Sequence, residues 1–191
     1  MRTDDPDRNP KPDPPVPTPG SSLDEFFRAC YEEIRAIAHR RLQTDRARNA
    51  LQTTDLVHDV YERLKKSRSL TLNDRVHFIA ITARTVRRHL CDRAREEKSE
   101  RAGGGLQRVT LSTDVAGYEP FQPSVIALGR AMDALEKLHA RQAWTIDMRF
   151  LGGLTVAEVA DKLGVSDETV KNDTRVALAF LRREISRLNL D

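Results

Sequence analysis

The chain has 191 residues, of which 39% are hydrophobic and 32% are charged, and its net charge at pH 7 is only +3. This length allows one domain or two small ones. The low net charge excludes a polycation that coats nucleic acid with its whole surface, so any nucleic-acid surface must be local. No apolar run approaches the length of a bilayer span and no signal peptide is visible, so we expect a cytoplasmic protein without a membrane partner.

The cysteines and the short sequence motifs give no sign of a metal or catalytic site. The two cysteines, Cys30 and Cys91, have neither a CxxC partner nor the spacing of metal ligands, which favours reduced, buried thiols. No nucleophile–base arrangement, phosphate-binding glycine loop or zinc motif is present. These patterns therefore give no candidate for a catalytic or cofactor-binding site.

The first half of the chain divides into a tail and a helical region. Residues 1–21 contain seven prolines and almost no apolar side chains, which predicts an extended, disordered tail. Helical periodicity then starts at Ser22, and one helix is expected from there to Leu42. A second helix is expected over 54–66, a loop over 67–73 and a third helix over 74–102. Residues 22–102 thus predict one small helical domain.

The second half begins after three consecutive glycines at 103–105. Residues 103–123 show no helical period and contain glycine and proline, which indicates a flexible linker that lets two domains sit apart. Periodicity resumes at Ser124, so residues 124–191 predict a second helical domain. The predicted fold class is all-α, with two small helical domains joined by a flexible linker.

The segment 154–173 has the pattern of a helix-turn-helix. Thr155 and Glu158 have the spacing of a capping box, which starts one helix, and Gly164 permits the left-handed conformation that ends it. Ser166 then caps a second helix. An ordinary helical hairpin is the alternative, but the combination of these signals at fixed offsets favours a DNA-binding motif.

The second helix of this motif has an outward face whose side chains suit contacts with DNA bases. Val170 and Val176 are expected to face the core, which leaves the polar positions between them outward. Arginine and lysine suit guanine edges and asparagine suits adenine. The predicted DNA contacts are Thr169, Lys171, Asn172 and Arg175.

A second basic surface is predicted on the late half of the third helix. Helical spacing places its arginines near one face, and the members proposed to bind DNA are Arg84, Arg87, Arg88 and Arg95. A solvated helix with internal salt bridges is the alternative, because acidic residues lie one turn from several of these arginines. Two weak DNA sites joined by a short linker would gain affinity from their effective concentration.

These features together resemble bacterial RNA polymerase sigma factors of the σ70 family, in particular the extracytoplasmic-function (ECF) type. The resemblance covers the chain from about Ser22 to Leu188. It is carried by the order and spacing of three segments: Thr54-Asp-Leu-Val-His-Asp-Val-Tyr-Glu-Arg-Leu64, His77-Phe-Ile-Ala-Ile-Thr-Ala-Arg84 and Leu163-Gly-Val-Ser-Asp-Glu-Thr-Val170. It implies that residues 22–102 form a σ2 domain and residues 124–191 a σ4 domain.

The resemblance also implies a function that is not enzymatic and needs no cofactor, which is to bind core RNA polymerase and direct promoter-specific transcription initiation. The σ2 domain would bind the β′ coiled coil and read the −10 element through the arginines named above, and σ4 would read the −35 element and meet the β flap. The loop 67–74 has no aromatic residue, so no residue can be named that captures a flipped −10 base. The implied polymerase-binding residues are Asp55, His58, Asp59 and Glu62.

The start of the polymerase-binding helix departs from the family pattern, since Thr54 stands where an acidic residue is common. A phosphate on Thr53 or Thr54 would add about 1.5 to 2 negative charges at a helix N-terminus, where negative charge is favoured. We therefore hypothesise control by a Ser/Thr kinase at these threonines, with simple helix capping as the alternative. An anti-sigma factor is the other candidate regulator.

Two other functions share parts of this sequence pattern. A helix-turn-helix regulator that is not a sigma subunit, such as a response-regulator output domain, also uses Thr-Val-Lys-Asn after the turn. It would need a βα receiver domain, which the helical period of residues 22–102 disfavours. A helical metal-dependent phosphohydrolase is suggested by His58 and Asp59 together with the other histidines. Adjacent residues of a helix point about 100° apart, so the side chains of His58 and Asp59 diverge, which disfavours a shared metal site.

Overall fold

The computed structural model describes residues 17–42, 53–67, 70–100 and 123–188. The predictions for residues 1–16 and for nearly all of the 103–123 linker lie outside these ranges. Every regular element within them is a helix, which confirms the predicted all-α class. No helix in the described part of the chain is long and apolar enough to cross a membrane.

The first helical unit is formed by α1 (Leu23–Ala29), α2 (Tyr31–Leu42), α3 (Thr53–Lys65) and α4 (Arg75–Glu100). The prediction of one helix over 22–42 is wrong, because the helix breaks at Cys30, where φ is −105° and ψ is 17°. Two backbone hydrogen bonds meet at the break: Cys30 N–H donates to Phe26 O and Ile34 N–H donates to Cys30 O, both at 3.0 Å. The apolar period therefore continues through the break and hides it in the sequence.

The second helical unit is formed by α5 (Val125–Leu138), α6 (Ala140–Ile146), the π-helical turn η1 (Asp147–Leu151), α7 (Val156–Leu163) and α8 (Asp167–Leu188). Ser124 caps α5 as predicted, its hydroxyl accepting from the backbone N–H of Ala127 at 3.1 Å. The π-helical turn is marked by the N–H of Gly152, which donates to Asp147 O at 2.9 Å. Five residues are too few to show a separate period, so this turn has no counterpart in the prediction.

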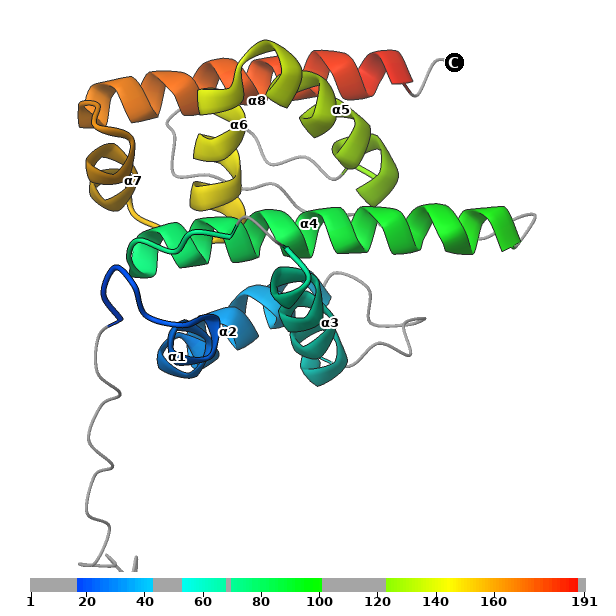
Figure 1. Cartoon of the computed structure of the whole chain (residues 1–191). Coiled ribbons are helices and arrows are strands. Elements are labelled where there is room, and N and C mark those ends of the chain that lie inside the picture. The colour runs from blue at the N-terminus through cyan, green and yellow to red at the C-terminus, as the bar shows by residue number, and fades with distance from the viewer. Residues whose placement is uncertain (1–16, 43–52, 68–69, 101–122, 189–191) are drawn as a thin grey trace, which may run out of the picture.

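The long helix α4 is the central element of the molecule. Figure 1 shows α1, α2 and α3 on one side of it and the second unit, α5 to α8, on the other. α4 packs against α2 and α3 on the first side and against α5, η1 and α7 on the second. The two units thus lie in direct contact, whereas the sequence had suggested domains that sit apart.

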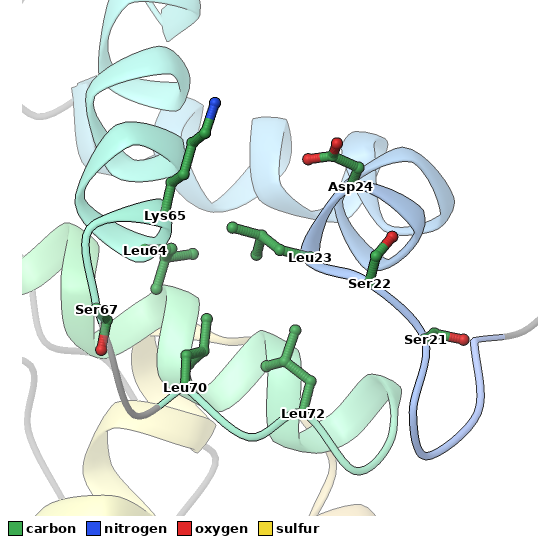
Figure 2. A pocket seen from close by; sticks show the side chains of 9 residues that line it. All are labelled: Ser21, Ser22, Leu23, Asp24, Leu64, Lys65, Ser67, Leu70 and Leu72. Atoms are coloured by element: carbon green, nitrogen blue, oxygen red, sulfur yellow. The ribbon is translucent and has the colours of Figure 1, made fainter.

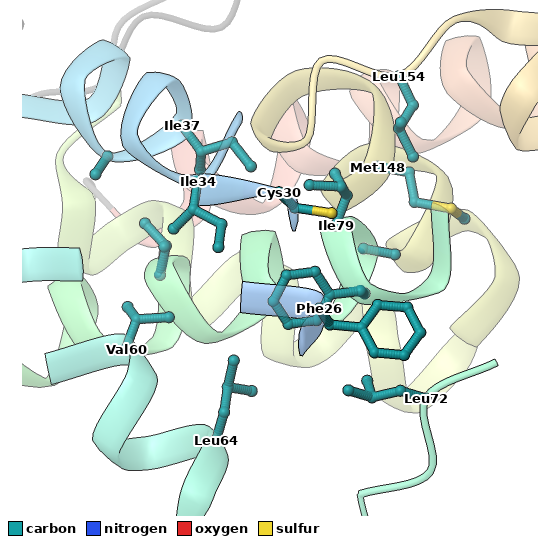
Figure 3. Packing of buried hydrophobic residues seen from close by; sticks show 14 of the residues in the cluster. Phe26, Cys30, Ile34, Ile37, Val60, Leu64, Leu72, Ile79, Met148 and Leu154 are labelled. Atoms are coloured by element: carbon teal, nitrogen blue, oxygen red, sulfur yellow. The ribbon is translucent and has the colours of Figure 1, made fainter. Parts of the chain in front are cut away.

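Two apolar clusters hold this arrangement together. The first contains Phe26 and Phe78 from the first unit, with ring centroids 5.5 Å apart, and continues into Met148 and Leu154 of the second unit (Figure 3). The second lies among α5, α6 and α8 and takes in Cys91 and Ala94 from α4. Both cysteines are free and buried, as predicted. Apolar side chains on two sides of α4 are the physical reason that the units pack together.

Candidate nucleic-acid interface

The helix-turn-helix predicted from residues 154–173 is present as α7, a tight turn and the start of α8. Thr155 Oγ1 accepts from the N–H of Glu158 at 3.2 Å, and Glu158 Oε2 accepts from the N–H of Thr155 at 2.8 Å, so the capping box is complete. Gly164 ends α7 in the left-handed region, with φ 64° and ψ 38°. These local predictions are confirmed.

The start of α8 follows the prediction, but its buried face is rotated from the expected one. Ser166 Oγ accepts from the N–H of Thr169 at 3.2 Å and Val170 is fully buried. Val176 is 43% exposed, so its predicted inward position is wrong, and Ala177 is buried instead. Six residues turn a helix by about 600°, which places Val176 about 240° around from Val170.

The cap of α8 gives a testable effect on stability. Ser166→Ala removes the acceptor for the Thr169 N–H and is expected to lower the free energy of unfolding by about 1 kcal/mol. Urea denaturation followed by circular dichroism measures this. Ser186→Ala is the matched control, because Ser186 is exposed inside the same helix, where alanine is the better helix former. Equal losses in both variants would contradict a capping role.

The predicted base-reading side chains lie together on the outer face of α8. Lys171, Asn172 and Arg175 are all exposed. Arg175 Nη2 donates to Asn172 Oδ1 at 2.7 Å, so these two side chains already share one orientation. Thr169 differs from them: it is half-buried, and its hydroxyl lies 2.9 Å from Ser166 Oγ, within the helix cap.

An ion pair that the sequence analysis missed fixes α8 on α6. Asp173 is buried, and its two carboxylate oxygens accept from Arg141 Nε at 2.7 Å and Nη2 at 3.2 Å. The hydrogen bond to Asp173, followed by the charge of the same carboxylate, raises the pKa of Arg141 above its ordinary value. Such a bidentate pair fixes position as well as charge, so it orients the recognition helix.

The arginine stripe of α4, defined as Arg84, Arg87, Arg88 and Arg95, faces the second unit, which buries most of Arg84 and Arg87 and leaves Arg88 51% and Arg95 41% exposed. Arg87 is the most deeply buried member, with only 3% of its side chain exposed. Its Nε donates to Asp147 Oδ1 at 2.8 Å and its Nη2 to Asp147 Oδ2 at 3.1 Å. Burial opposes the charged form, but the Asp147 carboxylate more than offsets it and raises the pKa of Arg87.

The other members of the stripe meet acids of α5. Arg84 pairs with Glu136 and lies over the Trp144 ring, with its guanidinium carbon 4.8 Å from the ring centroid. Arg88 Nη2 lies 3.2 Å from Glu136 Oε2, and Arg95 Nη2 lies 3.5 Å from Asp133 Oδ2. Arg84 Nε is buried and makes no hydrogen bond. The stripe is therefore one surface, as predicted, but its partners here belong to the same chain.

The predicted polymerase-binding residues lie on α3, which packs on the opposite side of α4 from the second unit (Figure 1). Asp55 and His58 are exposed, while Asp59 and Glu62 are half-buried. Asp59 Oδ2 lies 3.3 Å from Nε2 of His89 on α4. Burial lowers the pKa of His89, so this contact joins a carboxylate to a neutral imidazole near pH 7. Of the four predicted residues, Asp55 and His58 thus have the most exposed side chains.

A hollow of about 420 Å³ opens beside the loop that precedes α4. Figure 2 shows four leucines converging on it, from the start of α1, the end of α3 and the loop: Leu23, Leu64, Leu70 and Leu72. Polar groups line the same hollow, namely Ser21, Ser22, Asp24, Lys65 and Ser67. The loop has no aromatic residue, and leucines form its apolar wall instead.

The described residues contain no group of three or more histidine, cysteine, aspartate or glutamate side chains that could hold a metal ion. The phosphohydrolase alternative depends on His58 and Asp59. The side chain of His58 is exposed, whereas that of Asp59 contacts His89 of α4.

Fold and site together define an all-α DNA-binding protein with a helix-turn-helix in its second unit. A family model described as "ECF sigma factor" matches residues 20–187. The chain is also 30% identical over 174 residues to the ECF RNA polymerase sigma factor SigL of Mycobacterium tuberculosis strains H37Rv and CDC 1551, covering 86% of this chain and 92% of SigL. The chain belongs to the ECF sigma factor family, and the family predicted from the sequence is confirmed.

A structural similarity is also found to the sigma factor RpoE in complex with the anti-sigma factor NepR from Bartonella quintana. The match has a TM-score of 0.38 and 15% sequence identity, and it covers 85% of this chain and 98% of the other.

Proposed function

We propose that this chain binds core RNA polymerase in the bacterial cytoplasm and directs transcription initiation at promoters that it selects itself. One observation supports the proposal: the second unit carries a capped helix-turn-helix with outward Lys171, Asn172 and Arg175, and α4 of the first unit carries the arginine stripe. A regulator that reads one DNA element needs only the helix-turn-helix. Two DNA-reading surfaces on one chain suit recognition of a two-part promoter.

The −35 element would be read by α8 in the major groove. Exposed arginine, lysine and asparagine at the start of a recognition helix match the donor and acceptor pattern of base edges. Thr169 remains a proposed contact, to backbone phosphate, because its hydroxyl lies at the helix N-terminus beside Ser166.

The −10 element would be held by the α4 arginines, with the hollow of Figure 2 as the pocket for one unstacked base. A volume of about 420 Å³ is ample for a nucleobase, and its lining offers an apolar wall together with hydroxyl, carboxylate and ammonium groups. An extruded base is held by apolar contact on its faces and hydrogen bonds at its edge. The proposal thus assigns the capture of the base to leucines, in place of the usual aromatic platform.

Core polymerase would bind the outer face of α3, through Asp55, His58, Asp59 and Glu62. The acids give this face negative charge opposite an apolar core face, which suits a basic partner helix such as the β′ coiled coil. The β flap would meet the second unit.

Run-off transcription tests the proposal directly. Purified chain, bacterial core polymerase and a pool of upstream genomic fragments should give discrete transcripts that depend on the chain and supply both promoter elements. Failure to bind core polymerase, together with tight binding to duplex DNA alone, would overturn the sigma function in favour of a helix-turn-helix regulator. An anti-sigma factor would be identified separately, by its suppression of these transcripts.

Kinase control remains a proposal centred on the start of α3. Thr53 is its first residue and Thr54 is exposed in its first turn. Phosphate there would lie at the positive end of the helix dipole and strengthen the acidic face. Replacing both threonines with alanine should abolish any kinase-dependent rise in promoter activity in cells, measured with a reporter gene. Unchanged kinase dependence would contradict the proposal.

A further inference from the structure

An aromatic hollow of about 430 Å³ opens on the surface of the first unit, where α1, the start of α2 and α3 meet. It is lined by the rings of Phe27, Tyr31 and Tyr61 and by the charged side chains of Asp24 and Arg28. Two of the three tyrosines of the chain thus line one small surface. These five residues have no part in the proposed contacts with DNA or polymerase, so the proposed function leaves the aromatic hollow without a role.

The rings of the aromatic hollow are held in place by their own contacts. Phe27 and Tyr61 pack edge to face, with ring centroids 4.9 Å apart and planes at 74°. The Tyr61 hydroxyl donates to Asp24 Oδ1 at 2.7 Å, which ties α3 to α1 across the hollow. Tyr31 is 37% exposed. Preformed grooves of aromatic rings are the surfaces that bind proline-rich segments, because a polyproline II helix loses little entropy when it docks.

The N-terminal tail has the composition that such a surface binds. Residues 1–16 contain five prolines, and Pro12 and Pro15 have the PxxP spacing, which places both on one face of a polyproline II helix. We propose that the aromatic hollow is a polyproline-binding site and that its occupant is residues 10–15 of this chain's own tail. These residues lie outside the described ranges. The inference is independent of the proposed function.

The tail is long enough and close enough to follow the whole hollow. Pro17 is the first described residue, and α1 begins six residues later at Leu23. The seven residues of α1 span about 10 Å, whereas six residues of polyproline II span about 19 Å. A segment tethered this closely has an effective concentration of about 1 mM at the hollow. Even a weak polyproline contact would therefore be occupied.

The charges of the two surfaces also suit one another. Arg28 lines the hollow, and Lys65 Nζ lies 5.7 Å from the Tyr61 ring centroid. The one carboxylate of the hollow, Asp24, already accepts from the Tyr61 hydroxyl. Residues 1–16 carry four acidic and three basic side chains. A surface with an excess of cations thus meets a segment with an excess of acids, which favours docking.

Trypsin cleavage after Arg8 measures whether the tail is docked. The Arg8–Asn9 bond directly precedes the proposed docked segment, and a protease can cleave it only while the neighbouring residues are released from the hollow. Cleavage after Arg2, further from the docked segment, is the internal reference. Brief digestion of the full-length chain, followed by intact-mass spectrometry, gives both rates in one sample.

Two variants should release the tail from opposite sides of the contact. Tyr31→Ala removes an exposed wall of the hollow, and the double variant Pro12→Ser/Pro15→Ser removes the PxxP spacing without changing any described residue. With an effective concentration of about 1 mM and a Kd of about 100 μM for the free segment, either variant should raise cleavage after Arg8 about tenfold. A synthetic peptide of residues 1–16 with the same two substitutions gives the intrinsic cleavage rate.

Leu138→Ala is the matched control for Tyr31→Ala. It removes an apolar side chain that is 64% exposed, but from the second unit, so cleavage after Arg8 should stay within about twofold of the unmodified chain. An equal acceleration in Leu138→Ala would show that the tail responds to surface changes in general, and it would overturn docking at the aromatic hollow.

Fluorine NMR of the full-length chain with 3-fluorotyrosine observes the hollow itself. Pro12→Ser/Pro15→Ser should shift the signals of Tyr31 and Tyr61 and leave that of Tyr118 unchanged, with the three signals assigned by single Tyr→Phe variants. Unchanged cleavage rates and unchanged signals would overturn the tail as the occupant. If free peptide 1–16 then shifted the signals of Tyr31 and Tyr61, the hollow would take a proline-rich segment from another molecule. If the peptide gave no shift, the polyproline site itself would be overturned.

Discussion

Replacing Lys171 and Arg175 together with alanine is expected to weaken binding to the −35 element by at least about 30-fold, since each good base contact contributes about 1–3 kcal/mol. Both side chains are exposed on α8, so folding should be unaffected. Removing two base contacts should also relax sequence preference at those positions. Fluorescence anisotropy with the promoter duplex found by run-off transcription, at fixed salt, measures the loss.

The control for this experiment must remove the same charge from another surface. Arg183 is exposed further along α8, with its guanidinium carbon 5.6 Å from the Phe180 ring centroid, and Lys137 is exposed near the end of α5. A chain carrying Arg183→Ala and Lys137→Ala has the same net charge as the test variant. Equal losses in the two double variants would mean that α8 contributes only general electrostatic attraction to DNA.

The helix-turn-helix could be predicted in detail because its signals are local. A capping box spans four residues, a left-handed glycine ends a helix by itself, and Ser166 bonds a backbone N–H three residues away. Each of these needs no knowledge of the rest of the fold. The error at Val176 came from treating an apolar side chain as inward without counting its angle around the helix from Val170.

The packing of the two units could not be predicted in this way. Arg87 and Asp147 are 60 positions apart, and nothing near either residue specifies the other. Asp147 carries one usable signal, since an acid between Ile146 and Met148 in an apolar stretch indicates a buried charge that needs a partner. Gly129 carries another, as a glycine inside a strongly apolar helix. Together they indicate a covered surface but not which helix covers it.

Phe78→Ala is expected to lower the free energy of unfolding by about 3–5 kcal/mol, a large part of the stability of a small protein. Phe78 is fully buried, with its ring centroid 5.5 Å from that of Phe26 and 6.2 Å from that of Phe27 (Figure 3 shows the cluster). Truncation leaves a cavity that its packed neighbours fill only in part. Urea denaturation followed by circular dichroism measures the change.

Tyr31→Ala is the control for Phe78→Ala, because it removes an aromatic ring that is 37% exposed and should change stability far less.

The number of unfolding transitions tests whether the two units unfold together. The cluster around Phe78 continues into Met148 and Leu154, so the two packed units should unfold together and the variant should shift one transition as a whole. Trp144 fluorescence reports on the second unit. If the urea midpoint measured by this fluorescence stayed the same while the midpoint measured by circular dichroism fell, the two units would be unfolding independently. The contact between the two units would then contribute little to stability.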